Sequence, residues 1–429
     1  MKRKNILIIS YSFPPSNAPA AQRPYAFAKY LDKSKFNVTV LTCLNQDSSM
    51  GLSSKSNTEL NNVEIIKVKS INLEGYRTIK KASMVSSSEQ KTSLLKRKLF
   101  NFFQKLIFPD KGIFWVFYVL PFFYKNRDKF RPDVVFSTSP LFSNHLVTLF
   151  IMLFNKKAKY ISDFRDYHFI ENELQSGIKG KLNRFLEKRV LKKSDYSCFI
   201  SDSMTETYKQ YYPKFGHKFR AIYNGYDVDE FSNFTNIGSS KKLTFFYAGS
   251  FYKGVRSPKP LLLILEFLLE NDLIKKNDFR IEIAGNFENK LVEELQSLKV
   301  FENIEFLGLI SREKVLKKYL ESHVLWLIVG NRVNHFTGVP IKMYEYLGSK
   351  RPILNFSPLG SEPEKIINDL QAGWNIVNDE NDIQIKSKIV LQIFEKYKNK
   401  ELNTPMDYRD ISKYLRAFQT KTLEQLING

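Results

Sequence analysis

The segment 338–354, GVPIKMYEYLGSKRPIL, carries the most informative combination of charged residues in the chain. Pro340 is expected to open a short helix and Gly348 to close it, ahead of a buried strand. Lys342 and Glu345 are three residues apart, so both would project from one helical face. Helix-start amides and a cation bind phosphate, while a carboxylate accepts hydrogen bonds from ribose hydroxyls. The segment therefore suits a sugar nucleotide, and the alternative is a helix-surface salt bridge of little energetic value.

Further polar residues lie just beyond other expected strands, where open α/β sheets bind their ligands. In the first half, Arg165 and Asp166 either line such a site or form a structural ion pair. His168 follows them, although a lone histidine is more often an incidental surface residue. In the second half, Gly249 would let the backbone approach a phosphate, and Arg256 follows in the same loop. Both halves thus predict a ligand site at the carboxyl ends of their strands.

Short apolar runs alternate with helical patterns along the chain, which is typical of parallel βαβ construction. The expected strands are 5–10, 37–43, 63–68, 133–139, 159–163 and 196–201, then 243–248, 280–284, 304–309, 324–329, 352–355 and 374–377. Two such sheets predict two Rossmann-like domains, divided where the pattern lapses into a polar stretch at 215–240. The expected division is 1–220 for the N-terminal domain, 221–405 for the C-terminal domain, and 406–429 for a helix that packs back across the domains.

The composition indicates a globular protein with an anionic partner. The chain has 429 residues, of which 43% are hydrophobic, so it is long enough for two cores. A formal charge of +22 suits nucleic acid, a phospholipid surface or a phosphorylated substrate. Cys43 and Cys198 lie in apolar runs without metal-ligand spacing, which fits a reducing compartment such as the cytoplasm.

Membrane contact, if any, is expected to be peripheral. The apolar runs 113–123 and 146–154 fall short of the roughly 20 residues that a spanning helix needs. The segment 91–131 is basic and rich in aromatic residues. It leaves two alternatives open: a pair of ordinary helices with a solvated basic face, or a patch that contacts an anionic membrane surface.

Several motifs occur in an order that is more specific than any one of them. They are Tyr11-Ser-Phe-Pro-Pro15 with Ala20-Ala-Gln-Arg23, Ser137-Thr-Ser-Pro140, Asp163-Phe-Arg-Asp166, Ala248-Gly-Ser-Phe-Tyr-Lys-Gly-Val-Arg256, and the segment 338–354. Together they resemble the GT-B glycosyltransferases of the GT4 group, which are retaining enzymes that use nucleotide sugars. The resemblance covers nearly the whole chain.

The resemblance implies an α/β fold of two Rossmann-like domains that face each other across a cleft, with the acceptor on the N-terminal side and the donor on the C-terminal side. It implies catalytic roles for Arg165, Asp166, Arg256 and Lys342. The implied donor-binding residues are Gly249, Ser250, Lys253, Arg256, Gly338, Lys342 and Glu345. Those expected to face the acceptor or the cleft are Arg23, Ser139, His168 and Asn224, although Arg23 is alternatively a surface residue at a helix start. No metal site or cofactor is expected.

The chain departs from the family pattern at three places. Thr337 stands eight positions before Glu345, where the family has a second glutamate. Ser250 replaces a residue that is often basic, and Lys253 is the candidate to compensate. Alanines occupy the loop before Arg23 that is usually rich in glycine. Donor binding is therefore the firmer expectation and sugar handling the weaker one.

The expected function is transfer of a sugar, with retention of configuration, from a nucleoside diphosphate sugar to a glycan or lipid-linked acceptor. Cell-surface polysaccharide biosynthesis is the expected setting, at the inner face of the membrane. Two alternatives stay open: a nucleotide-sugar epimerase of the same architecture, and a catalytically impaired partner protein that keeps the fold. A nucleic-acid-binding protein is disfavoured, because the aromatic residues cluster in apolar runs and not at spaced stacking positions.

Overall fold

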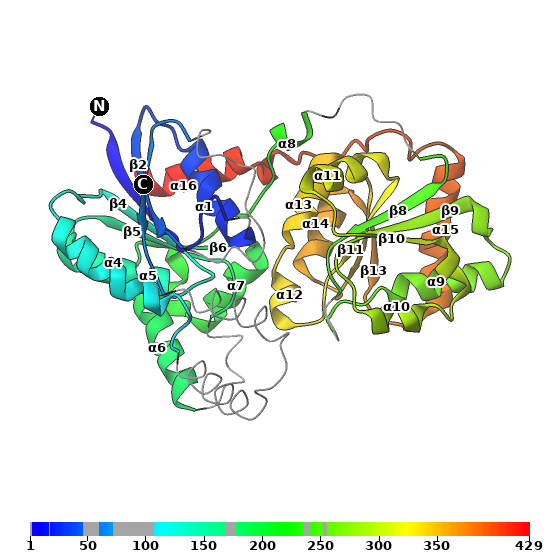
Figure 1. Ribbon diagram of the computed structural model, residues 1–429, viewed down its shortest axis with the longest axis horizontal. Helices are drawn as coiled ribbons and strands as arrows, with labels where there is room; N and C mark the ends of the chain where they lie inside the picture. The colour runs from blue at the N-terminus through cyan, green and yellow to red at the C-terminus, as the bar shows by residue number, and fades with distance from the viewer. Residues whose placement is uncertain are drawn as a thin grey trace, which may run out of the picture. The chain divides into compact units, whose positions relative to one another are not determined.

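The computed structural model describes residues 2–16, 18–45, 60–71, 107–168, 177–232, 234, 240–251 and 255–429. The chain forms two compact units (Figure 1). The first consists of Met1–Ile200, Met204–Ile222 and Thr420–Gly429, and the second of Ser201–Ser203 and Tyr223–Gln419. The loops expected at 48–60 and 70–91, and the start of the basic segment 91–131, lie almost wholly outside the described residues.

The first unit is built on a parallel sheet of seven strands. The strands are β1 (Lys4–Ile9), β2 (Phe36–Cys43), β3 (Val63–Val68), β4 (Val134–Thr138), β5 (Lys159–Phe164), β6 (Tyr196–Phe199) and β7 (Phe219–Ala221). Their order is β3-β2-β1-β4-β5-β6-β7, so the direction of winding reverses between β1 and β4. The sequence analysis missed β7, whose three residues are too few for a periodic signal.

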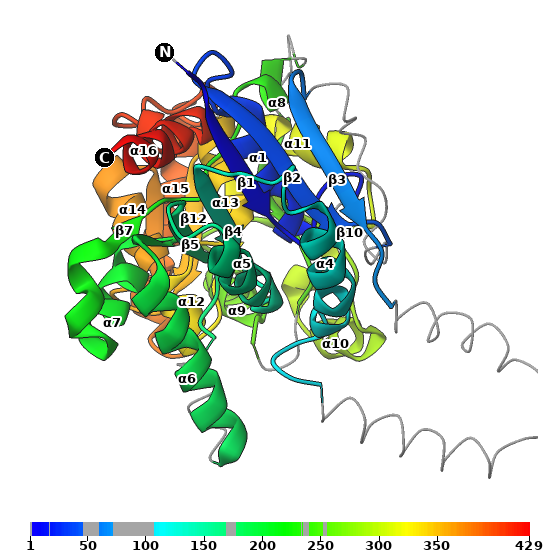
Figure 2. The ribbon, with the colours of Figure 1, turned by 90° about the vertical axis from the view of Figure 1, so that its left-hand side faces the viewer.

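Helices cover both faces of this sheet because successive strand residues point to opposite sides. Ile6 and Ile8 pack with α1 (Pro19–Tyr30) and α16 (Arg416–Asn428). Helices α4 (Ile113–Asn126) and α5 (Ser143–Phe154) lie on the other face (Figure 2). Leu7 and Ile9 pack with them there. The β5–β7 side is covered by α6 (Ile178–Lys193) and α7 (Asp202–Tyr211), which is followed by a 3-10 turn, Pro213–Lys218.

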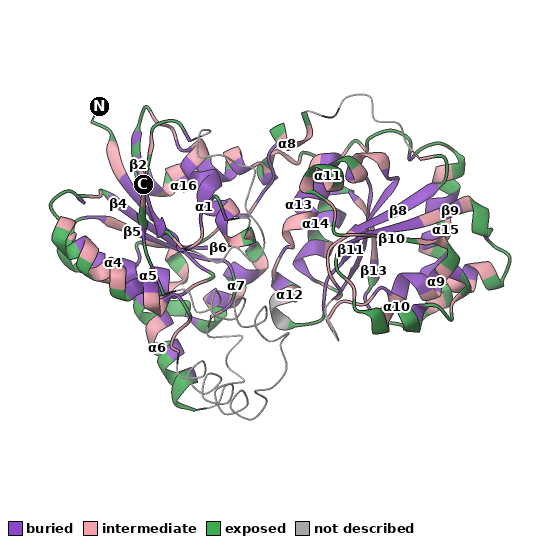
Figure 3. Cartoon of the chain, in the orientation of Figure 1, coloured by how far each residue is buried: buried purple, intermediate pink, exposed green. Residues whose placement is uncertain are grey.

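The second unit contains a parallel sheet of six strands in the order β10-β9-β8-β11-β12-β13. The strands are β8 (Leu243–Ala248), β9 (Phe279–Ala284), β10 (Ile304–Gly308), β11 (Val324–Ile328), β12 (Ile353–Ser357) and β13 (Gly373–Val377). Both sheets are largely buried (Figure 3). The carboxyl ends of β8 and β11 flank the reversal of strand order, which is where ligands of such sheets bind.

The helices of the second unit are mostly short, and two of the longest, α9 and α15, pack on one face of the sheet with the main apolar core. They are α8 (Asp229–Ser232), α9 (Lys259–Glu270), α10 (Asn289–Leu295), α11 (Arg312–Glu321), α12 (Val333–Thr337), α13 (Ile341–Ser349), α14 (Glu362–Leu370) and α15 (Ile383–Lys398). Short 3-10 turns span Lys276–Asp278, Lys299–Asn303 and Ser412–Tyr414.

The ends of α13 differ from the sequence prediction. Pro340 is the N-cap and not the first helical residue, and the helix continues through Gly348 to Ser349. The chain turns instead at Lys350, whose φ is 56°. Gly348 is needed for packing, because a Cβ there would lie 2.7 Å from ring atoms of both Tyr226 and Phe231.

Within the described part of the chain, no helix combines the length and the apolar character needed to cross a bilayer.

Candidate functional site

Two glycines bring the loops after β8 and β9 into direct backbone contact. The Gly249 amide donates a hydrogen bond to the Ala284 carbonyl at 2.8 Å. Gly249 has a φ of 149° and Gly285 a φ of 150°, a region that side chains rarely adopt. A Cβ on Gly285 would lie 2.0 Å from the Gly249 oxygen, so this position admits only glycine without movement of the loop.

Lys342 reaches this loop from α13. Its Nζ donates to the Ala248 carbonyl at 2.6 Å and lies 4.2 Å from the centroid of the Tyr247 ring. A Cβ on Gly249 would be 2.4 Å from the same Nζ, so the glycine makes room for the cation. Burial, and to a smaller extent the charge of Arg256, lowers the pKa of Lys342 to about 7, while Glu345 acts in the opposite direction. Because burial and Arg256 disfavour the charged form of Lys342, a bound anion beside its Nζ would stabilise the ammonium.

His335 on α12 lies close enough to Arg256 to feel its charge, and the sequence analysis did not identify it. Burial is the main cause that lowers its pKa, followed by the charges of Arg256 and Arg332. Of the atoms in the described residues, none is a hydrogen-bond partner for the buried Nδ1 of His335. A Cβ on Gly330 would lie 2.6 Å from that Nδ1 and 2.7 Å from the Val255 carbonyl, so another glycine permits close packing here. The charge of Arg256 thus acts on both Lys342 and His335. Arg256 and Lys342 favour an anionic ligand by charge, and the neutral imidazole of His335 adds a polar group beside them.

Glu345 is buried, and its partners differ from those predicted. Its Oε1 accepts a hydrogen bond from Arg312 Nη1 at 2.9 Å, and its Oε2 accepts one from the Tyr319 hydroxyl at 3.1 Å. Arg312 Nη2 also donates to Glu230 Oε2 at 2.7 Å. The alternative of a surface salt bridge between Lys342 and Glu345 is therefore wrong, because Lys342 bonds to Ala248 and Glu345 is 6% exposed.

A periodic pattern could not reveal the partners of Glu345, because Arg312 is 33 residues away in the sequence. The side chains of Arg312 and Tyr319 both come from α11. They hold the carboxylate in one orientation and leave further lone pairs on its oxygens for hydroxyl donors.

The other residues expected on the donor side lie in the second unit or outside the described chain. Ser250 accepts a hydrogen bond at its carbonyl from the Tyr247 hydroxyl at 3.3 Å. Gly338 precedes α13 and is half-buried, and the Thr337 carbonyl accepts from Ser201 Oγ. Asn224 is half-buried, and its Oδ1 has no hydrogen-bond partner among the residues the structure describes. Lys253 lies outside the described residues.

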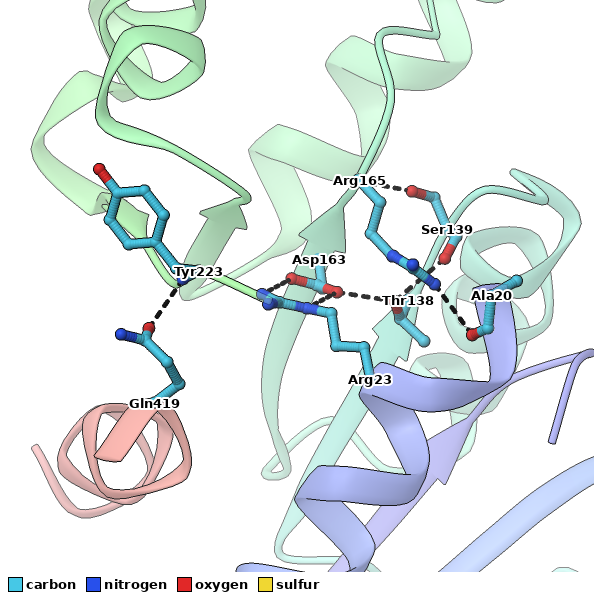
Figure 4. A network of polar contacts seen from close by, with 8 residues as sticks. All are labelled: Ala20, Arg23, Thr138, Ser139, Asp163, Arg165, Tyr223 and Gln419. Carbon is cyan, nitrogen blue, oxygen red and sulfur yellow. Dashed lines mark hydrogen bonds and ion pairs between the residues drawn. The ribbon is translucent and has the colours of Figure 1, made fainter. Parts of the chain in front are cut away.

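In the first unit, Arg23 and Asp163 form a buried ion pair (Figure 4). Arg23 Nε donates to Asp163 Oδ2 at 2.9 Å and Nη2 donates to Oδ1 at 2.7 Å. Thr138 Oγ1 also donates to Oδ2 at 2.6 Å. Arg23 is 2% exposed, so the alternative of a surface arginine is wrong and its charge is balanced by Asp163. Asp163, which the sequence analysis assigned no role, orients Arg23.

Arg165, Asp166 and Ser139 lie at the carboxyl ends of β4 and β5. The Arg165 amide donates to Ser139 Oγ at 2.7 Å, and its guanidinium donates to the carbonyl of Ala20 at 2.9 Å (Figure 4). The guanidinium also donates to the carbonyl of Pro19 at 3.2 Å. Asp166 is exposed. The structure thus brings Arg165 and Ser139 together and fixes Arg165 to the start of α1.

His168 is not the incidental surface residue that its isolation in the sequence suggested. Its ring stacks on Phe142 with centroids 4.1 Å apart. Burial lowers the pKa of His168 to about 4, against the opposing effect of a hydrogen bond with Asn183 on α6. The imidazole is therefore neutral at physiological pH and fixed in orientation.

Across the described residues, no group of three or more histidine, cysteine, aspartate or glutamate side chains is arranged to hold a metal ion.

No family model and no curated protein sequence matches the chain. Its structure is nevertheless similar to solved structures along its whole length. An apo lipopolysaccharide outer core galactosyltransferase, WaaB, has a TM-score of 0.59 at 12% identity, with 99% of each chain covered. TarM from S. aureus, solved with UDP, has a TM-score of 0.59 at 11% identity, covering 99% of this chain and 100% of that one. A putative UDP-N-acetylglucosamine 2-epimerase from Listeria monocytogenes has a TM-score of 0.51 at 10% identity, covering 100% and 96%.

These likenesses show that the chain has the GT-B fold, as the sequence analysis predicted from its motifs.

Proposed function

We propose that this protein is a glycosyltransferase that moves a sugar from a nucleoside diphosphate sugar to a glycan or lipid-linked acceptor, with retention of configuration. The GT4 group is the proposed subfamily, and cell-surface polysaccharide biosynthesis is the proposed setting. The activity is proposed to need no metal ion, because cationic side chains take up the charge of the leaving group.

The observation that carries the proposal is the gathering of like charges beside a glycine loop. Burial first, and then the charge of Arg256, lowers the pKa of both Lys342 and His335, and Lys342 is held against the Ala248 carbonyl at 2.6 Å. Such mutual repulsion destabilises the ligand-free protein and is relieved by a bound anion. A diphosphate supplies two adjacent anionic groups, and the open backbone at Gly249 allows them close approach.

In the proposed reaction, negative charge develops on the diphosphate as its bond to the anomeric carbon breaks. Arg256 and Lys342 stabilise this charge, and the first amides of α13 add the positive end of the helix dipole. Glu345, held by Arg312 and Tyr319, accepts hydrogen bonds from the ribose. Arg165, Asp166, Ser139 and His168 are proposed to contact the transferred sugar or the acceptor.

The test is a screen of nucleoside diphosphate sugars with membrane extract as acceptor, read by mass spectrometry. Replacement of Lys342 or Arg256 by alanine should lower turnover by about 10²–10³-fold, because each removes a charge that stabilises the leaving group. Lys314→Ala, an exposed lysine on α11 of the same unit, is the matched control and should leave turnover unchanged. Circular dichroism checks that each variant is folded.

The outcomes separate the alternatives. Unchanged turnover in both Lys342→Ala and Arg256→Ala would sink the assignment of these residues. Free monosaccharide isomers formed without any acceptor would favour the epimerase, a reading that the Listeria structure keeps open. Absence of affinity for every nucleoside diphosphate in calorimetry would favour an impaired partner protein.

A further inference from the structure

Helix α6 exposes large apolar side chains among many positive charges. Ile178 is 79% exposed, Leu182 43% and Phe185 59%. All seven lysines and arginines of this helix are exposed as well. Its one acid, Glu187, is buried and accepts hydrogen bonds from the hydroxyls of Tyr208 at 3.1 Å and Tyr212 at 2.9 Å. With seven exposed basic residues and one buried acid, the outer surface of α6 carries many more basic than acidic side chains.

The three apolar side chains lie on one side of the helix, opposite its buried side. Residues at spacings of three and four share a helical face, as 178, 182 and 185 do. The buried side is formed by Gly180, Asn183, Glu187, Val190 and Leu191. At 100° per residue, these two sets point in opposite directions. Arg189 and Lys192 continue the outer side toward the C-terminal end, so an apolar half is followed by a basic half.

The apolar half is at the end of α6 that extends past the sheet of the first unit (Figure 2). The helix follows β5, so its first turns lie near the carboxyl ends of the strands, where Ser139 and Arg165 lie. Asn183, on the buried side, hydrogen-bonds to His168 and ties the helix to this edge. The exposed apolar side thus lies on the same edge of the first unit as the residues proposed to contact the acceptor.

We propose that the outer face of α6 is an interfacial anchor that inserts Ile178, Leu182 and Phe185 into an anionic membrane while its lysines and arginines contact the lipid headgroups. Moving these apolar side chains from water to the boundary between lipid headgroups and acyl chains lowers the free energy. The basic residues around them are attracted to anionic lipid headgroups. Nucleic acid is a less suitable partner for this face. The phosphates and sugars of its backbone offer no apolar surface against which the aliphatic side chains at the centre of the face could pack. The anchor would bring a lipid-linked acceptor to the carboxyl edge of the first sheet.

The full-length protein is tested by sedimentation with vesicles of phosphatidylcholine mixed with phosphatidylglycerol, compared with phosphatidylcholine alone. The wild-type protein should bind the anionic vesicles. The double variant Ile178→Ser with Phe185→Ser should bind at least about tenfold more weakly, because two inserting side chains are lost. Lys188→Gln with Lys192→Gln should weaken binding to a similar extent and reduce its sensitivity to salt.

Matched controls come from α5, which belongs to the same unit. Leu153 is 63% exposed, and Lys156 and Lys157 follow the helix as exposed basic residues. Leu153→Ser and the pair Lys156→Gln with Lys157→Gln remove the same kinds of group and should leave vesicle binding within about twofold of wild type. All the substituted residues are exposed, so thermal unfolding should be unchanged.

The proposal is overturned if wild type does not bind anionic vesicles, if the α5 variants lose as much binding as the α6 variants, or if the Ile178 and Phe185 double variant binds like wild type. Binding to duplex DNA without binding to vesicles would overturn it in favour of nucleic acid. The measurement needs no nucleotide, so its failure is distinct from failure of the proposed transferase activity.

Discussion

Lys342 is a half-buried lysine whose charge depends on pH near neutrality, so the proposed binding of a nucleotide should depend on pH. Its pKa is lowered to about 7, so above pH 7 much of the free protein carries a neutral amine. A bound diphosphate favours the ammonium and raises that pKa, so binding takes up a proton. Affinity for a nucleoside diphosphate should therefore fall as pH rises above 7, by up to about tenfold per pH unit.

Calorimetry between pH 7 and pH 9 tests this, since the phosphates themselves lose their last proton near pH 6. Repeating the titration in two buffers with different ionisation enthalpies measures the proton uptake directly. Lys342→Met should bind more weakly and lose the pH dependence. If Lys342→Met keeps the same slope, another group titrates and the interpretation fails.

At the same scale, the sequence predicted where charged residues would gather but not which of them would be buried together. Arg165 and Asp166 attracted attention because they follow a strand, yet the buried carboxylate is Asp163 inside β5. Its partner, Arg23, is 140 residues away. Local spacing says nothing about a contact over that separation, and the same holds for Arg312 with Glu345. His335 gave no signal, because its burial depends on Gly330 and Val255 from other segments.

At the scale of elements, the loops after β8 and β9 hold Lys342 through the shape of their backbone. Gly249→Ala would place a Cβ 2.4 Å from Lys342 Nζ and impose a φ of 149° on alanine, which costs about 1–3 kcal/mol. The lysine must move, so nucleotide affinity should fall about tenfold or more while the fold persists. In Gly285→Ala the new Cβ would lie 2.0 Å from the Gly249 carbonyl oxygen. This variant should lose more nucleotide affinity than Gly249→Ala, because the backbone, and not a flexible side chain, would have to move.

Gly308→Ala is the control for these glycines. Its φ is 63°, yet a Cβ there has nothing within 4 Å. It should cost about 1–2 kcal/mol of stability without a change in nucleotide affinity. Urea denaturation and calorimetry measure the two effects separately. An equal loss of affinity in Gly308→Ala and Gly249→Ala would show that backbone strain, and not the position of Lys342, is responsible.

The ends of elements show why such local details escape sequence reasoning. Glycine usually ends a helix, which made Gly348 the expected end of α13. In the structure the rings of Tyr226 and Phe231 lie so close to Gly348 that no side chain would fit there. The glycine is therefore required for packing, and the helix ends with the left-handed residue Lys350 instead. Glycine does commonly end helices, but here a contact with the segment that holds Tyr226 and Phe231 determines why the glycine is present.

At the scale of the whole molecule, the alternation of apolar runs and helical patterns was enough to predict two parallel sheets, and the motif resemblance was needed to predict the GT-B fold. It could not show that the chain enters the second unit at Ser201–Ser203 and leaves it again. Nor could it show that the last ten residues, Thr420–Gly429, belong to the first unit. The division between residues 405 and 406 remains a prediction. The periodic sequence pattern reports only the local secondary structure and not which domain a segment belongs to.

The C-terminal half of α16 should stabilise the first unit without contributing to nucleotide binding. Leu423 and Ile427 are buried among Ile6, Ile8 and Phe27. Lys159 Nζ donates to the Ile427 carbonyl at 3.2 Å. Leu423→Ala and Ile427→Ala should each lower the free energy of unfolding of that unit by about 2–5 kcal/mol, because each leaves a cavity.

Urea denaturation of the full-length protein measures this loss, with Gln425→Ala as an exposed control on the same helix that should change stability by less than about 0.5 kcal/mol. Nucleotide affinity, measured where the variants are folded, should match wild type, because Lys342, Arg256 and Glu345 all belong to the second unit. A drop in affinity that parallels the loss of stability would contradict this assignment. It would mean that the proposed donor site depends on the first unit as well.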